Sequence, residues 1–160
     1  MFHFLKKKDS KHMLGAPAAG RAVSIKEVND PTFAEEILGK GVAVIPSEGK
    51  IYAPADGEIG MVFDTLHAVS LTTEYGAEVL IHVGLDTVDM KGKGFQLHVS
   101  LGEKVEKGAP LITFSPEEIK KAGHMALTIL AVTDEAGVKK IHFHTGIHAT
   151  AGETVIADFE

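Results

Sequence analysis

Hydrophobic and polar positions alternate along most of this chain in short runs that end at glycine or other turn residues, which is the pattern of β-strands. The turn signals recur about every ten residues, and long amphipathic helical segments do not separate the runs. The pattern therefore predicts an all-β, antiparallel sandwich or barrel rather than alternating βα units. The predicted strands are Val42–Ile45, Lys50–Ala53, Glu58–Phe63, His67–Thr72, Glu78–Val83, Gln96–Val99, Pro110–Phe114, Met125–Ala131 and Thr154–Ala157.

Two short helices are predicted as connections between strands. Asp30-Pro31 supplies an N-cap and a first-turn proline before residues 32–38, and Gly39 supplies a stop. Residues 115–118, Ser-Pro-Glu-Glu, begin the second helix with a capping box, and Gly123 ends it. Each helix spans only one to three turns.

The length of 160 residues predicts one domain with enough chain to bury a core. Residues 1–20 resemble a flexible N-terminal lead, because a run rich in glycine, alanine and proline closes them. We therefore expect a single domain over residues 21–160. The stretch 102–111 recurs loosely at 147–156, and such turns fit a sandwich with duplicated halves.

Two histidines fall in neighbouring predicted strands, and the hairpin register decides whether their side chains meet. A turn of two or four residues within 74–77 sets Val69 opposite His82, with Gly76 supplying any positive φ. On that register His67 is the diagonal neighbour of His82 on the same face, roughly 7–8 Å away at the backbone. Two imidazole rings on one face of a sheet form a candidate site.

Alternation along each strand assigns every residue of this hairpin to a face. The histidine face is an apolar surface with two polar groups, which more often marks a protein contact than a small-molecule site. In the alternative, both faces are buried and a backbone carbonyl satisfies each histidine. The histidine face holds His67, Val69, Leu71, Leu80 and His82, and the other face holds Ala68, Ser70, Thr72, Val79, Ile81 and Val83.

Composition narrows the classes of function. A formal net charge of −6 argues against a general nucleic-acid binder, which would carry a basic stripe. The absence of cysteine excludes disulfides, thiolate chemistry and cysteine-ligated zinc. In residues 1–8 the lysines follow a very short apolar run, unlike a signal peptide, and no segment approaches the ~20 apolar residues of a membrane span. We expect a soluble, cytoplasmic protein without a cofactor.

His82 and His67 suit a reaction in which a ring nitrogen accepts a transferable group. A neutral imidazole presents one unprotonated nitrogen near pH 7 and can form covalent intermediates. The Gly84 carbonyl could accept from Nδ1–H of His82, which would leave Nε2 free to attack. Thr65 could orient the His67 ring through its hydroxyl, and His67 could then donate to a phosphoryl oxygen on His82.

Other polar clusters give weaker signals. Asp86 follows His82 in a His-x-x-x-Asp pattern and is either a general base or a turn residue that caps Thr87 or Val88. Residues 91–95, Lys-Gly-Lys-Gly-Phe, are too short and isolated for a phosphate loop and predict a turn. His142 and His144 share a strand face near His148, a spacing that can bind zinc, but without a third placed ligand a solvated edge is favoured.

Several of these segments together resemble the glucose-type enzyme IIA of the bacterial phosphoenolpyruvate-dependent sugar phosphotransferase system. They are residues 51–59, His67-Ala68-Val69, residues 78–88 and residues 91–95, in that order and spacing. The His-x-Gly-x-Asp-Thr-Val run with an upstream His-Ala is specific in combination. The resemblance runs from about Val23 to Phe114 and more loosely to Glu160. It implies an antiparallel β-sandwich of duplicated halves, of the barrel-sandwich hybrid type.

The resemblance also implies roles for individual residues. His82 would be the phosphoacceptor, His67 its phosphate-stabilising partner, and Thr65 the hydroxyl that orients His67. The phosphoryl group would come from the histidine carrier protein HPr and pass to the IIB domain of a membrane sugar permease. No metal is implied, although His67 and His82 could bind zinc adventitiously. The positions that match the family's docking surface are Phe33, Phe63, Leu80, Val88, Asp30 and Asp86.

Two departures from the family pattern affect contact details. Position 80 is leucine where some members carry phenylalanine, and residues 125–148 are richer in histidine than the motif requires. The resemblance leaves open which sugar, which permease and which regulatory targets apply.

Two other classes of function remain as alternatives. Zinc peptidases of the LytM type resemble this fold, and His82, Asp86 and His144 could be fitted to their ligands. Those enzymes place glycine turns after the first ligand motif, whereas residues 53–59 precede it here, and they are usually exported. The third possibility is a regulatory binding module in which the histidines are structural.

Overall fold

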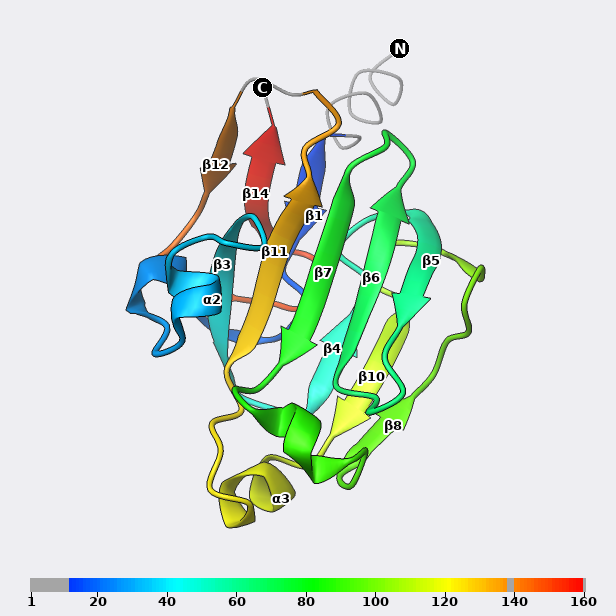
Figure 1. Ribbon diagram of the computed structural model, residues 1–160. Helices are drawn as coiled ribbons and strands as arrows, with labels where there is room; N and C mark the ends of the chain where they lie inside the picture. Colours follow the sequence, from blue (N-terminus) through cyan, green and yellow to red (C-terminus); the bar gives the residue numbers. More distant parts are fainter. Residues whose placement is uncertain (1–11, 138–139, 160) are drawn as a thin grey trace.

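The computed structural model describes residues 12–137 and 140–159. Within that part of the chain, strands dominate and helices are short (Figure 1). The helical segments are η1 (Ile25–Glu27), α2 (Pro31–Ala34), η2 (Thr87–Met90) and α3 (Pro116–Lys121). The strands are β1 (Met13–Gly15), β2 (Gly20–Ser24), β3 (Lys40–Pro46), β4 (Lys50–Tyr52), β5 (Gly57–Val62), β6 (Ala68–Thr73), β7 (Glu78–Val83), β8 (Phe95–Leu97), β9 (Lys104–Val105), β10 (Pro110–Phe114), β11 (Thr128–Asp134), β12 (Ile141–Phe143), β13 (His148–Ala149) and β14 (Val155–Phe159).

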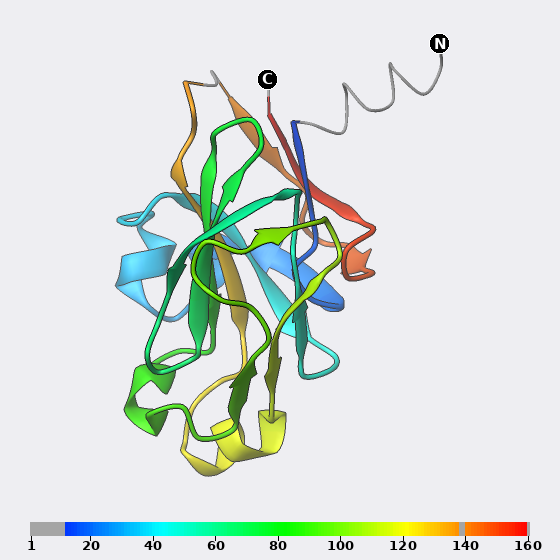
Figure 2. The same ribbon diagram turned by 90° about the vertical axis from the view of Figure 1, so that its right-hand side faces the viewer.

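The described strands form three antiparallel sheets. The largest has the order β13-β2-β3-β11-β7-β6-β5-β9, and the two smaller ones have the orders β1-β14-β12 and β4-β10-β8. Figure 2 shows the smaller sheets on one side of the large sheet and α2 on the other side. The all-β, antiparallel sandwich with two short connecting helices is therefore confirmed.

The main core lies between the large sheet and the two smaller ones. Leu14, Ile51, Ile81, Leu111 and Ile156 are fully buried there, and they come from all three sheets. A smaller cluster covers the outer face of the large sheet beneath α2, where Phe33 packs with Ala43 and Ile129. Strand β11 is consequently buried on both faces, and it supplies the floor of the outer face next to β7.

The predicted strands were largely found. Strands β7 and β10 have the predicted bounds, and the other seven overlap the predicted ranges with shifted ends. The predicted strands do not include β1, β2, β9, β12 or β13. The prediction of a flexible lead over residues 1–20 is wrong for residues 13–20, because β1 pairs with β14 and Leu14, Ala16 and Ala18 are fully buried. Residues 1–11 lie outside the described part.

The two predicted helix starts are confirmed, and one predicted helix is too long. Asp30 Oδ1 accepts a hydrogen bond from the Thr32 amide at 3.0 Å, and Ser115 Oγ accepts one from the Glu118 amide at 3.2 Å. Helix α2 ends at Ala34 rather than near residue 38. Glu36 has a φ of 57°, a left-handed conformation that a helix cannot continue through.

The predicted register of the β6–β7 hairpin is wrong by one residue. Ala68, not Val69, lies opposite His82. The hairpin closes with a three-residue loop, residues 74–76, in which Gly76 has a φ of 90° and Thr73 faces Ala77. Two- and four-residue loops give the predicted register, whereas a three-residue loop with its last residue left-handed moves the pairing by one.

The corrected register exchanges the faces of β6 and leaves those of β7 as predicted, because a one-residue slip moves every side chain to the other face. Val69 and Leu71 face the main core together with Ile81. Ala68 shares the outer face with Leu80, where they form a small cluster with Ala131. An uninterrupted strand would therefore place His67 on the opposite face from His82.

None of the helices among the described residues combines the length and the hydropathy that crossing a membrane requires.

Candidate functional site

Small side chains on the neighbouring strands leave a hollow beside β7 on the outer face of the large sheet. His82 lies between Ala68 on β6 and Ile129 on β11, and Leu80 lies between Ser70 and Ala131. Alanine and serine do not reach as high above the sheet as the side chains of β7. The hollow is about 610 Å³, and His82 and Leu80 belong to its lining.

The two histidine rings meet even though the strand register would separate them. Their centroids are 4.7 Å apart and their planes cross at 87°, an edge-to-face contact. His67 lies just before β6 begins, so strand alternation does not fix its direction. Phenylalanine rings enclose the pair, Phe33 at 5.0 Å from His82 and Phe63 at 5.4 Å from His67. The paired histidines predicted from the sequence are thus adjacent.

His67 is the more deeply enclosed of the two side chains, with 2% of its surface exposed. The Thr65 hydroxyl lies 2.7 Å from its Nδ1, which is the contact predicted from the sequence. Burial lowers the pKa of His67, and a hydrogen bond to the backbone of Thr65 offsets part of that effect. The ring is therefore neutral near pH 7, and Thr65 contacts it through both its side-chain hydroxyl and its backbone.

His82 is partly buried and strongly held in its neutral form. Burial lowers its pKa to about 4, and the neighbouring His67 acts in the same direction. The Gly84 carbonyl and the Asp30 carboxylate oppose these effects more weakly. Nδ1 of His82 is buried without a hydrogen bond of good geometry, so the predicted bond to Gly84 is at most an electrostatic contact.

Gly84 must be glycine for His82 to be presented in this way. It has a φ of 81°, and its amide donates to the Leu127 carbonyl at 2.7 Å. A Cβ atom at this position would lie 2.3 Å from Thr87 Cγ2 and 2.9 Å from the Met125 carbonyl oxygen. The Thr87 hydroxyl donates to the Val83 carbonyl, which fixes the turn after His82.

The six positions proposed for docking all line the hollow that contains His82. Sequence reasoning missed two further apolar residues there, Leu38 and Met61, which are 40% and 51% exposed. Met61 follows a bulge in β5, which breaks the alternation that would have identified it. The predicted docking residues in the lining are Asp30, Phe33, Phe63, Leu80, Asp86 and Val88.

Asp86 occupies the position before η2 with a left-handed φ of 60°, and its side chain makes no capping hydrogen bond. The capping role considered for it is therefore wrong, and its exposed carboxylate stands at the rim of the hollow. The predicted turn at residues 91–95 is confirmed for its first four residues, and Phe95 begins β8.

The histidines near the C-terminus do not join this site. His144 Nε2 lies 2.6 Å from the Asp158 carboxylate, and His142 lies opposite Asp158 in the β12–β14 pairing. Within residues 12–137 and 140–159, no three histidine or acidic side chains are grouped so that they could hold a metal ion. The peptidase alternative, which needs His82, Asp86 and His144 around zinc, is therefore unsupported.

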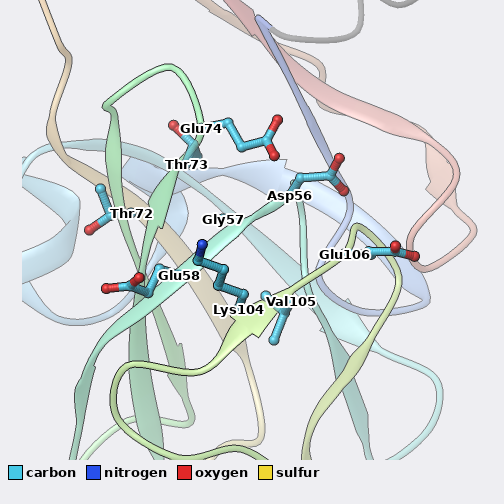
Figure 3. Close-up of a pocket in the computed structure, with 9 residues that line it drawn as sticks. All are labelled: Asp56, Gly57, Glu58, Thr72, Thr73, Glu74, Lys104, Val105 and Glu106. Atoms are coloured by element: carbon cyan, nitrogen blue, oxygen red, sulfur yellow. The ribbon is translucent and has the colours of Figure 1, made fainter.

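A second hollow of about 630 Å³ lies where β5, β6 and β9 meet (Figure 3). Its charged side chains are exposed, and Asp56 Oδ1 accepts a hydrogen bond from the Lys107 amide at 2.7 Å. It contains no histidine. Its lining consists of Asp56, Gly57, Glu58, Thr72, Thr73, Glu74, Lys104, Val105 and Glu106.

Comparison with known proteins gives a consistent result. Residues 12–138 match the family described as phosphoenolpyruvate-dependent sugar phosphotransferase system, EIIA 1. The glucose-specific EIIA component of Bacillus cereus is 40% identical over 149 residues, which cover 93% of this chain and 90% of that protein.

Two further proteins extend this comparison. The glucosamine-specific EIICBA component of Bacillus subtilis is 44% identical over 137 residues, which cover 84% of this chain and 22% of that larger protein. The structure of glucose permease IIA from Mycoplasma capricolum superposes with a TM-score of 0.85 at 31% identity, over 91% of this chain and 94% of that one.

Proposed function

Since the chain belongs to the EIIA 1 family of the phosphoenolpyruvate-dependent sugar phosphotransferase system, we propose that His82 is the residue on which it carries the phosphoryl group. Proteins of this family are phosphotransferase components that act in sugar uptake. The observation that supports His82 is its position: a neutral imidazole in an apolar hollow, in edge-to-face contact with a second histidine.

The chemistry follows from the neutral ring. Nδ1 is the buried nitrogen of His82, so Nε2 is the nitrogen directed to the open side of the hollow. The Nε2 lone pair attacks phosphorus while the bond to the donor's nitrogen breaks and its electron pair stays with the donor. Passing the group on reverses these roles at the acceptor. A pKa of about 4 keeps this lone pair available at physiological pH.

His67 and Thr65 complete the proposed site. In the tautomer that we propose, the Thr65 hydroxyl donates to Nδ1 of His67 across their 2.7 Å contact, and the ring proton of neutral His67 is on Nε2. This Nε2–H then donates to a phosphoryl oxygen on His82 and stabilises the charge that develops during transfer. His67 thereby holds the group without itself attacking phosphorus.

The surroundings of His82 suit protein partners. The donor that we propose is HPr, whose basic surface would face Asp30 and Asp86 at the rim of the apolar hollow. The acceptor is a IIB domain of a membrane permease, and the fused glucosamine EIICBA and beta-glucoside EIIBCA relatives carry such a domain by name. The glucose-specific relatives make glucose the first sugar to test.

The remaining parts of the proposal concern the whole protein. We propose that it works in the cytoplasm as a single EIIA domain over residues 21–160, to which β1 is added. It needs no cofactor, because the phosphoryl group passes directly between histidines and then to the acceptor. Regulatory partners of the unphosphorylated form are a further class to examine on the same surface.

Intact-mass measurement tests the proposal directly. Phosphoenolpyruvate, enzyme I and HPr are mixed with the protein, and a mass increase of one acid-labile phosphoryl group is expected. His82→Ala should abolish the increase, whereas His98→Ala should not, because His98 is exposed and bonded to Thr113. Absence of the increase in the unaltered protein, or its survival in His82→Ala, would refute the assignment.

A further inference from the structure

The contact between the two histidine rings needs an explanation that the sheet itself does not provide. Ala68 lies opposite His82, so an uninterrupted β6 would direct His67 to the core side together with Val69. The His67 carbonyl still accepts from the Val83 amide at 2.8 Å, as that register requires. The backbone must therefore turn immediately before His67 to bring its ring against His82.

Leu66 provides that turn. Its φ is 61°, in the left-handed region that is uncommon for a residue with a side chain other than asparagine or aspartate. Its amide donates to the Phe63 carbonyl at 2.8 Å, which closes the turn between β5 and β6. Both neighbours of Leu66 in the sequence belong to the site. The Thr65 hydroxyl forms a hydrogen bond with the His67 ring, and the His67 ring contacts that of His82.

Packing on two sides holds the Leu66 side chain in place. It is partly buried and packs against the main core. On its other side it lies over Gly92, where an added Cβ would be 3.5 Å from Leu66 Cδ1. Gly92 belongs to the turn that follows η2. This turn is part of the segment that leads away from His82 after β7. Leucine, which gains nothing locally from a left-handed backbone, is thus fixed there by tertiary contacts.

We propose that Leu66 is a positioning residue for phosphoryl transfer, whose left-handed backbone directs the His67 ring toward Thr65 and His82. The expected effect on phosphoryl transfer rests on the proposed function. The effect of Leu66 on the direction of the His67 ring does not depend on that function. Leu66 makes no contact with phosphate in this account. It acts by setting the direction of a side chain that does.

Substitutions at Leu66 separate its backbone role from its packing role. Asparagine and glycine tolerate the left-handed conformation but lack the apolar side chain, whereas valine keeps apolar bulk and strongly disfavours that conformation. If the backbone role dominates, Leu66→Asn and Leu66→Gly retain the His67 geometry and Leu66→Val loses it. If only packing matters, the ranking is reversed.

Two measurements determine which Leu66 variants keep the His67 geometry. Ring ¹⁵N shifts report the tautomer of His67, and we expect Nδ1 to remain the unprotonated nitrogen in Leu66→Asn and Leu66→Gly, as in the unaltered protein. Phosphoryl transfer from the protein to a IIB domain should stay within about threefold in these variants and fall roughly 10- to 100-fold in Leu66→Val, while His82 still accepts phosphate.

The inference is overturned if Leu66→Asn and Leu66→Gly lose the His67 tautomer signature, or if Leu66→Val retains both signature and transfer rate. The tautomer signature of Leu66→Asn and Leu66→Gly tests the inference even if the Leu66→Val variant does not fold. Failure of the proposed function is a different result: the unaltered protein then accepts no phosphate, while the ring shifts still report whether Leu66 positions His67.

Discussion

Two hollows of nearly equal volume, about 610 and 630 Å³, differ in the kind of side chain that lines them. The hollow over β7 has a floor of small residues, apolar walls and a buried ring nitrogen without a hydrogen bond. The hollow at β5, β6 and β9 is lined by exposed carboxylates and Lys104 (Figure 3). Volume is thus a poor guide to chemistry, whereas burial of an ionisable group changes what that group can do.

The physical difference is the free energy of charging a side chain. Exposed carboxylates keep their contact with water, so burial gives them no special reactivity. An imidazole removed from water keeps its lone pair because protonation would place a charge in an apolar site. His82 is removed from water in this way, because Phe33 and His67 pack against its ring.

The largest expected effect is the loss of the phosphate-stabilising ring. His67→Ala should still accept phosphate at His82 but should transfer it to a IIB domain roughly 10²–10³-fold more slowly, the usual cost of one lost donor to a developing charge. Rapid-quench kinetics measure the transfer step alone. His98→Ala is the matched control, an exposed histidine bonded to Thr113. Equal rates in both variants would remove His67 from the mechanism.

The next effect concerns the turn that presents His82. Gly84→Ala should lower the free energy of unfolding by about 2–4 kcal/mol, from steric overlap added to left-handed strain. Gly102→Ala is the control. Its φ is 82°, close to the 81° of Gly84, but an added Cβ meets nothing within 4 Å, so it should cost about 1 kcal/mol. Urea unfolding compares the two, and equal losses would show that the close approach at Gly84 is relieved easily.

The third effect is a pH dependence of stability. The pKa of His82 is about 4 in the folded protein and about 6.5 in the unfolded chain. Between these values the unfolded state binds more protons, so the stability supplied by neutral His82 is present above pH 6.5 and is lost as the pH falls toward 4. His82→Gln should flatten this part of the curve in urea titrations. A variant with the same slope as the unaltered protein would contradict burial as the cause.

The smallest expected effect compares single carboxylates in the two hollows. Asp86→Asn should slow phosphorylation by HPr a few-fold at low salt, because rim charges mainly change the association rate, and the difference should shrink as salt is added. Glu58→Gln, an exposed acid of the other hollow, should leave the rate unchanged. Stopped-flow mixing at two salt concentrations distinguishes them, and equal slowing would point to net charge rather than docking.

Much of the site could be predicted because it depends on local sequence. The alternation in residues 78–83 assigns Leu80 and His82 to one face of β7 whatever strand pairs with it, and that assignment holds. The Thr65–His67 contact spans two residues and was also found. Local patterns therefore identified both histidines and the hydroxyl beside one of them.

The register of β6 and the direction of His67 could not be predicted, because they depend on backbone conformations that the residue types do not determine. The register of β6 turned on whether the hairpin loop has two, three or four residues, and glycine at position 76 fits each of them. Predicted alternation could not place His67 correctly, because a left-handed leucine precedes it. The prediction that the rings meet was right although the register behind it was wrong.

The N-terminal strand was missed for a different reason. Glycine, alanine and proline in residues 15–20 suggested a flexible lead, but small side chains are what the tight packing there requires. An added Cβ on Gly15 would lie 2.7 Å from Lys107 Cε, and Ala16 and Ala18 are fully buried. Composition alone does not distinguish a flexible segment from a closely packed one.

The most direct test of the central claim is to locate the phosphoryl group. The protein is labelled with ¹⁵N at its histidine rings, phosphorylated with phosphoenolpyruvate, enzyme I and HPr, and examined by long-range ¹H–¹⁵N spectra. We predict that one ring changes to a phosphorylated form, that it is His82, and that phosphorus is attached at Nε2. Phosphate on His67, on Nδ1 of His82 or on a histidine outside the hollow would contradict the account.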